Sequence, residues 1–288
     1  MLGNFVGILF DGIAYGALLF LISIGLAITL GLMNFINLAH GAFAMFGGYV
    51  CVLVMMRAGV PFFAALGAAF AAGGALGAVL ERLLYRRVYS RTHLDQVLFT
   101  IGLTFMSIAT ASYLFGPGQQ PVRMPAYLTG QVHLLGIDVG AYRLFLIGVV
   151  AVITLLLSWL VERTRFGAQV RAAVDNRAAA EGLGIDVARV FSVTFALGSA
   201  LAALGGGMAI DVLGLDPSFP LKYMVYFLLV VAVGGPRTIR GPLIAALILG
   251  VFDVAGKYYI PEVGSFVIYA LMVTMLVLFP DGLLGKRT

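Results

Sequence analysis

Long apolar runs recur along this chain and constrain its fold more than any other feature. The nine runs are 7–32, 35–56, 60–80, 95–115, 142–161, 190–213, 222–236, 241–258 and 262–279. Because a helix needs about 20 apolar residues to cross a bilayer, they predict an all-α polytopic membrane protein with about 8–10 transmembrane helices. The run 222–236 is short, and glycine–proline pairs separate it from 241–258. These two runs therefore predict either two crossings or one broken hairpin.

The composition supports a membrane location and excludes nucleic-acid binding. The chain is 61% hydrophobic and only 11% charged, whereas a soluble domain carries roughly 25% charged residues. The net charge is +5, but the basic residues fall in short loops and form no stripe with interleaved aromatic residues. No separate soluble domain is predicted, so residues 1–288 form a single transmembrane domain.

The basic residues predict the orientation, because Lys and Arg gather in cytoplasmic loops. With the N-terminus outside, nine spans place the C-terminus in the cytoplasm. All of the 18 Lys and Arg residues then lie inside except Arg57, Arg123, Arg143, Lys222 and Lys257. The large segment 116–141 lies outside and begins as a turn-rich loop at Gly116-Pro117-Gly118.

The largest inner segment, about 162–190, predicts a short amphipathic helix on the cytoplasmic face. Ala, Gln, Arg and Glu favour a helix, and Gly182 and Gly184 supply a stop. The pairs Arg171–Asp175 and Arg177–Glu181 have the i,i+4 spacing of helical ion pairs.

The chain lacks the motifs of an enzyme or an ATPase. Its single cysteine, Cys51, and its scattered His40, His93 and His133 have no metal-ligand spacing, so we expect no metal and no cofactor. The tail with Gly285-Lys286 lacks the spacer and the Ser/Thr of a phosphate-binding loop. Uphill transport would therefore draw its energy from another chain or from an ion gradient.

Intramembrane acids would be the signature of an ion-coupled carrier. Asp11, Asp211 and Asp253 lie in or beside the spans, but the topology places all three near outer ends, and Lys257 follows Asp253 by one turn. Interfacial placement, contact with an external partner and proton coupling remain open for them. Among the many glycines, the run 205–207 leaves both close helix packing and a local break open.

A polar block interrupts the apolar pattern near the second span. Asn34, Asn37 and His40 recur every three residues, which places them on one face of a helix. Such groups either line a pathway or hold neighbouring helices together through hydrogen bonds.

Three ordered motifs carry a resemblance to a known family. They are the block Asn34-Phe-Ile-Asn-Leu-Ala-His-Gly41, the segment 171–186, and the later Val233-Gly-Gly-Pro-Arg-Thr-Ile-Arg-Gly-Pro242. Together they resemble permease subunits of ATP-driven branched-chain amino acid importers of the Liv type, over nearly the whole chain. The resemblance implies the permease fold of the ribose and branched-chain amino acid importer family, in a bacterial inner membrane.

The resemblance also implies partners and a coupling site. The expected partners are a second permease subunit, two cytoplasmic ABC ATPase subunits, a periplasmic solute-binding protein and membrane lipid. The segment around 170–186 is similar to the helix that such permeases present to the ATPase, although its glutamate is displaced. The implied contact residues are Arg171, Asp175, Asn176, Ala179, Ala180, Glu181 and Gly184.

For the solute pathway we predict a mostly apolar lining with a few hydrogen-bonding groups: Asn34, Asn37, His40, Gln96 and Thr100. The branched-chain amino acids Leu, Ile and Val are the expected solutes. A urea or short-amide permease, a sugar permease, and a self-sufficient secondary carrier or channel remain as alternatives, whereas no catalytic constellation supports an intramembrane enzyme.

Overall fold

Nine apolar helices make up most of the structure, a computed structural model that describes residues 2–33, 35–122, 124–134, 137–235, 238–279 and 282–283. Within these ranges each predicted span corresponds to one helix. The helices are α1 (Leu2–Met33), α2 (His40–Ala58), α3 (Phe62–Leu83), α4 (His93–Phe115), α6 (Ala141–Arg163), α9 (Val187–Leu213), α10 (Phe219–Gly234), α11 (Arg240–Tyr259) and α12 (Gly264–Leu278). Seven are long and apolar enough to cross a membrane, while α10 and the apolar part of α12 are shorter. The predicted all-α polytopic fold is confirmed.

Short elements connect these helices. They are the 3-10 turn η1 (Tyr85–Arg87), α5 (Ala126–Thr129), the strands β1 (Gln131–Leu134) and β2 (Ile137–Gly140), α7 (Arg165–Asp175) and α8 (Arg177–Gly182). The two strands form an antiparallel hairpin that pairs His133 with Asp138. The sequence predicts only a loop there, because a four-residue strand is too short for a period-two pattern to stand out.

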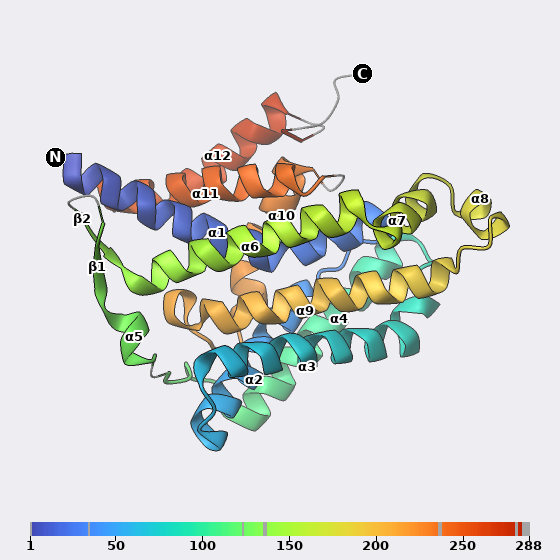
Figure 1. Cartoon of the computed structure of the whole chain (residues 1–288), viewed down its shortest axis with the longest axis horizontal. Coiled ribbons are helices and arrows are strands. Elements are labelled where there is room, and N and C mark those ends of the chain that lie inside the picture. Colours follow the sequence, from blue (N-terminus) through green and yellow to red (C-terminus); the bar gives the residue numbers. More distant parts are fainter. Residues whose placement is uncertain are drawn as a thin grey trace.

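The long helices lie side by side, and α1 and α9 occupy the interior (Figure 1). Helix α9 packs against α1, α2 and α3, and α1 also packs against α11. The segment α7–α8 lies at one end of the bundle and the β1–β2 hairpin at the other (Figure 1). The two large connecting segments, 116–141 and 162–190, therefore occupy opposite ends (Figure 1).

The triple glycine of α9 is a packing surface and not a break. Helix α9 runs uninterrupted from Val187 to Leu213 through all three glycines. A Cβ at Gly206 would overlap the backbone of Ala44 in α2, and one at Gly205 would contact Ile22 in α1. The missing side chains let three backbones approach closely where lipid provides no hydrophobic drive for association.

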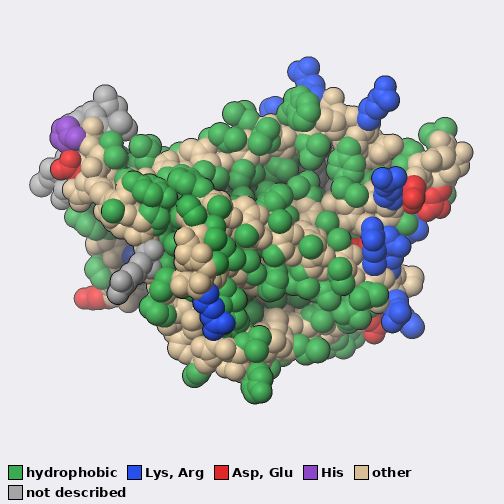
Figure 2. Space-filling view, turned by 60° about the horizontal axis from the view of Figure 1, so that its bottom comes forward, with side chains coloured by type: hydrophobic (Ala, Val, Ile, Leu, Met, Phe, Trp, Pro, Cys, Tyr) green, Lys and Arg blue, Asp and Glu red, His purple; other side chains and the backbone are tan. Residues whose placement is uncertain are grey.

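Apolar side chains cover the sides of the bundle, and charged side chains gather at one end (Figure 2). Leu155, Trp159 and Val277 are 71%, 60% and 74% exposed. An exposed apolar band of this kind is typical of a surface that faces hydrocarbon. The surface therefore agrees with the apolar runs of the sequence, and both indicate a membrane-embedded bundle.

Candidate functional site

The connection between α1 and α2 holds the predicted polar block. Asn34 lies outside the described residues. Asn37 is 1% exposed, and its Oδ1 accepts hydrogen bonds from the Ala39 amide (3.1 Å) and from the Tyr85 hydroxyl (3.2 Å). The His40 ring is also buried, and its Nε2 lies 2.8 Å from the carbonyl oxygen of Ile22 in α1. Both side chains thus fix this connection to neighbouring helices.

Helix α4 holds the same connection from another side. The Thr100 hydroxyl accepts a hydrogen bond from the Leu38 amide (3.3 Å), and the Thr104 hydroxyl donates one to the Leu38 carbonyl (3.4 Å). The Gln96 amide nitrogen donates to the carbonyls of Tyr89 and Arg91, whereas its Oε1 accepts no hydrogen bond from the described residues. The structure therefore brings Asn37, His40 and Thr100 together around one loop.

A largely apolar cavity of about 350 Å³ lies between α2, α3 and α4. Phe43, Tyr49, Leu76, Leu103 and Phe115 are among its lining residues. Of the predicted pathway residues that the structure describes, none lines this cavity. Their hydrogen bonds to backbone groups and to Tyr85 favour a structural role over a lining role in this conformation, and the pathway role stays a prediction.

The predicted coupling segment, residues 162–190 and called the coupling segment below, forms two helices where the sequence predicts one. The helix is interrupted at Asn176, whose backbone is extended. Its Oδ1 caps α8 by accepting a hydrogen bond from the Ala179 amide (3.0 Å). An Asn side chain competes with helical hydrogen bonds in this way. Helix α8 then ends before Gly184, which has the left-handed φ of +81°.

Within α8, Arg177 and Glu181 form the predicted ion pair at 2.9 Å. Arg171 instead donates to the Val161 carbonyl, and no ion pair with Asp175 is present among the described residues. The two helices each turn one small residue inward, Ala173 and Ala180, to pack with Val187 at the start of α9. Asp175, Asn176, Ala179, Glu181 and Gly184 are exposed. The segment is thus attached to α9 on one side and open on the other.

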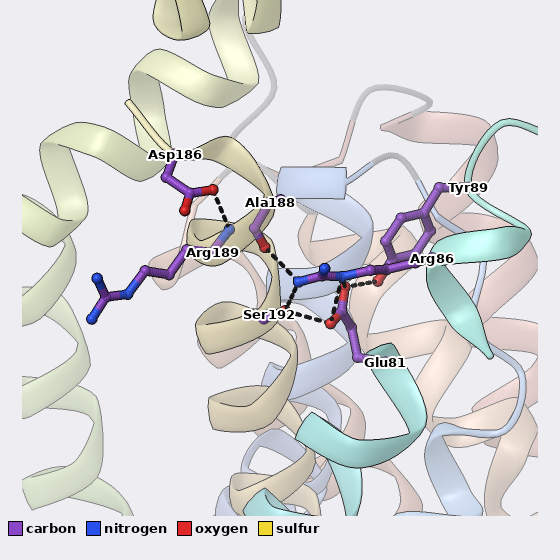
Figure 3. Close-up of polar contacts among 7 residues, drawn as sticks. All are labelled: Glu81, Arg86, Tyr89, Asp186, Ala188, Arg189 and Ser192. Carbon is purple, nitrogen blue, oxygen red and sulfur yellow. Dashed lines mark hydrogen bonds and ion pairs between the residues drawn. The ribbon is translucent and has the colours of Figure 1, made fainter. Parts of the chain in front are cut away.

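A buried carboxylate lies beside this attachment and was missed by the sequence reasoning. Glu81 lies in the last turn of α3 with a side chain that is 1% exposed, and Arg86 contacts it at 3.1 Å. Arg86 also reaches the Ala188 carbonyl and the Ser192 hydroxyl of α9 (3.4 and 2.6 Å), and Ser192 donates to Glu81. Figure 3 shows Arg86 between the two helices, while Arg189 points away on the other side of α9.

Tyr89 completes this network. Its hydroxyl lies 3.4 Å from a Glu81 oxygen and donates to it. Burial raises the pKa of the Tyr89 phenol, and the Glu81 charge raises it further, so the hydroxyl keeps its proton. The position of Glu81 in the sequence is a signal for this network, because a charged residue next to an apolar run rarely lacks a partner. The predicted span ended at residue 80, one position before Glu81.

The network fixes which loops share an end of the bundle. Arg86 ties the α3–α4 connection to α9 beside the coupling segment, and Arg240 at the start of α11 lies 3.8 Å from Glu162 at the end of α6. Three segments that the charge distribution places on one side therefore lie together. In the described part of the chain no group of His, Cys, Asp or Glu forms a metal site.

An apolar helical bundle that presents two short charged helices at one end belongs to the class of polytopic α-helical membrane proteins. Comparison with known families gives a definite assignment. The profile described as "Branched-chain amino acid transport system / permease component" matches residues 8–276. The chain belongs to this family and is a multi-pass inner-membrane protein. Permeases of this family generally work with ATPase and binding-protein partners.

Named relatives support the assignment along nearly the whole chain. The high-affinity branched-chain amino acid transport system permease protein LivH of Salmonella typhimurium is 29% identical over 96% of this chain and 94% of its own length. BraD of Pseudomonas aeruginosa is 26% identical over 96% and 95%, and a probable LivH of Methanocaldococcus jannaschii is 27% identical over 96% and 92%. No solved structure matches the chain.

Proposed function

We propose that this chain carries branched-chain amino acids across the inner membrane as the permease subunit of an ATP-driven importer. The family and the names of its relatives support the solute class. The absence of a phosphate-binding loop in the sequence supports a separate ATPase. We further propose the expected assembly of a second permease subunit, two cytoplasmic ATPase subunits and a periplasmic binding protein.

The observation that carries the proposal is the way α7 and α8 are attached. Ala173 and Ala180 pack against Val187, which is the first residue of α9, the helix at the centre of the bundle. The opposite side of the segment exposes Ala179 and Glu181. A partner that pushes the exposed side moves α9 directly, because a closely packed contact transmits displacement.

This attachment supports the proposed coupling residues. The exposed side would contact the ATPase through the side chains of Arg171, Asp175, Asn176, Ala179 and Glu181, while Ala180 and Gly184 set the position and the end of α8.

The polar block has a separate proposed role. Asn37, His40, Gln96 and Thr100, together with Asn34, would border the pathway in another conformation of the transporter.

Co-purification followed by ATPase assays tests the assembly. The chain is isolated from its native membrane with its partners, and ATP hydrolysis is measured with binding protein and with leucine. We expect leucine-dependent stimulation, and uptake that survives dissipation of the proton gradient. Leucine uptake should be inhibited by valine and not by urea or ribose. Transport by this chain alone in liposomes without ATP would contradict the proposal.

Substitutions in the coupling segment test the site. Ala179→Trp places a bulky ring on the exposed side of α8, and Asp175→Arg reverses a charge beside it. Both variants should remain in the membrane with less co-purifying ATPase, and the ATPase that stays bound should hydrolyse ATP without uptake. Ala126→Trp, on exposed α5 at the other end of the bundle, is the matched control and should retain the ATPase. Normal coupling in both segment variants would remove the assignment.

A further inference from the structure

A second cavity lies at the end of the bundle opposite the coupling segment. It has a volume of about 530 Å³ and opens among α1, α6, α9, α10, α11 and α12. Both acids and bases line it, together with tyrosine rings and a few aliphatic side chains. A cavity that combines apolar walls with a few convergent charges has the usual construction of a small-molecule site.

One carboxylate in this cavity is only half satisfied. The Asp253 side chain is 1% exposed, and its Oδ2 contacts the Lys257 ammonium at 2.5 Å. Its Oδ1 is buried and accepts no hydrogen bond from any described residue. Burial of an unsatisfied carboxylate oxygen is costly, so a cationic hydrogen-bond donor that reaches it would bind favourably.

One cation in the same cavity, Lys222, has no carboxylate partner among the described residues. The Lys222 ammonium lies 5.4 Å from the centroid of the Tyr223 ring, and no carboxylate of the described residues lies within ion-pair distance of it. Tyr223 itself is fixed by a hydrogen bond from its hydroxyl to the Leu213 carbonyl (3.0 Å). The remaining charges, Asp11 and Arg143, pair with each other at 2.5 Å.

The cavity is therefore lined by one carboxylate oxygen that has no hydrogen-bond partner among the described residues, and by one ammonium group whose neighbour is the Tyr223 side chain and not a carboxylate. A small zwitterion carries the complementary groups, because its ammonium is a donor for a carboxylate oxygen such as Asp253 Oδ1 and its carboxylate is an acceptor for an ammonium such as that of Lys222. The apolar wall near these charges includes Val212, Leu213 and Val254, which suit an aliphatic side chain. We propose that this cavity is a binding site for a free aliphatic amino acid, at the end where solute enters. The entry role rests on the proposed function, whereas the binding chemistry does not.

The same pair of opposite charges occurs in the head group of a zwitterionic lipid. The two sources differ in their anionic group and in their apolar part, because an amino acid brings a carboxylate and a short aliphatic side chain, and a lipid head group brings a phosphate. The aliphatic residues of the wall favour the amino acid. Binding should be weak, because a permease must release its solute.

Direct binding to the purified permease in detergent, measured by saturation-transfer NMR or calorimetry, tests the site. Four probes are compared: L-leucine, 4-methylpentanoate, which lacks the ammonium, 3-methylbutylamine, which lacks the carboxylate, and phosphoethanolamine. Each charge-assisted contact is worth tenfold or more in affinity, so each truncated leucine analogue should bind about tenfold more weakly than leucine. Equal binding of the three, no leucine binding, or preference for phosphoethanolamine would overturn the proposal.

Substitutions locate the binding within the cavity. Lys222→Met should weaken leucine binding about tenfold or more, and Lys222→Arg should restore much of it. Because Lys222 is exposed and Arg57 is an exposed cation outside this cavity, Arg57→Met is a matched control and should leave binding unchanged. Asp253→Asn keeps the shape and removes the negative charge, and should weaken binding to leucine more than to 4-methylpentanoate. Unchanged leucine binding in either cavity variant would reject the site.

The outcome is separable from that of the proposed function. If the purified permease does not bind leucine while the complete importer takes up leucine with ATP, the cavity proposal fails and the function stands. If leucine binds through Lys222 and Asp253 but the chain co-purifies with no ATPase, the importer assignment fails and the binding site stands.

Discussion

Asn37 and Tyr85 form a buried side-chain pair that has no access to water. The Tyr85 side chain is 0% exposed, and its hydroxyl donates to Asn37 Oδ1. Asn37→Leu would leave that hydroxyl without a partner, at a cost of about 1–3 kcal/mol in the free energy of unfolding. We expect a lower thermal midpoint in detergent, and a smaller loss when Tyr85→Phe is combined with Asn37→Leu than the two single losses predict together.

This double-mutant cycle also separates the two roles of the polar block. If Asn37→Leu alone abolishes uptake while the double variant regains both stability and uptake, the hydrogen bond is structural. If stability returns and uptake does not, Asn37 contributes to the pathway. Strictly additive midpoints would mean that the pair is not coupled at all.

Arg86 and Arg87 provide a matched comparison at adjacent positions. Arg86 compensates the buried Glu81 and bridges to α9, whereas Arg87 is exposed and makes no ion pair with the described residues. Arg86→Gln should lower the free energy of unfolding by about 1–3 kcal/mol, toward the lower end because the arginine is itself 41% exposed. Arg87→Gln should change it by less than about 0.5 kcal/mol. Equal melting temperatures for the two variants would show that the Glu81 network adds nothing to stability.

At the scale of elements, Asn176 determines where α7 ends and α8 begins. Asn176→Ala removes the cap of α8 at a cost of about 0.5–2 kcal/mol. Because about 1.4 kcal/mol is a factor of ten, amide exchange in α8 should accelerate roughly 2- to 30-fold. Hydrogen exchange measured by mass spectrometry checks this. Asn176→Asp keeps a capping oxygen and should exchange like the native chain, and unchanged exchange in the alanine variant would disprove the capping role.

The positions of the long helices could be predicted because each is an apolar run whose length and composition are sufficient for insertion into lipid. Residues 95–115 correspond to the helix His93–Phe115, and residues 142–161 to Ala141–Arg163. The contacts between helices could not be predicted in the same way. Ser192 donates a hydrogen bond to Glu81 from more than a hundred positions away in the sequence, and Gly206 packs against the backbone of Ala44. The hydropathy of the sequence contains no information about which helices make these contacts.

The predicted polar site shows the same limit. The three-residue spacing of Asn34, Asn37 and His40 predicts one helical face, but the described residues 35–39 form a non-helical connection before α2 begins at His40. Asn37 accepts hydrogen bonds from Ala39 within this connection and from Tyr85 across it. The polar residues in this stretch therefore provide hydrogen-bond partners for the backbone of a loop inside the bundle. This backbone needs such partners because water is absent there.

For the whole molecule, sidedness is the property on which the importer assignment depends. The structure places the coupling segment and the β1–β2 hairpin at opposite ends, and the basic residues predict that the coupling segment faces the cytoplasm (Figure 1). Cysteine labelling decides the orientation, because the native thiol, Cys51, is buried and can be replaced in a Cys51→Ala background. Gln131→Cys on β1 and Glu181→Cys on α8 then provide one exposed thiol at each end.

In spheroplasts treated with a membrane-impermeant maleimide, Gln131→Cys should react at once, and Glu181→Cys only after the membrane is permeabilised. Both thiols should react fully in detergent, which shows that neither is hindered by the fold. The reverse pattern would place the exposed side of α8 outside the cytoplasm, where a cytoplasmic ATPase cannot contact it. The attachment of α8 to α9 would then have no role in coupling. The fold would stand, and the transport mechanism proposed for it would not.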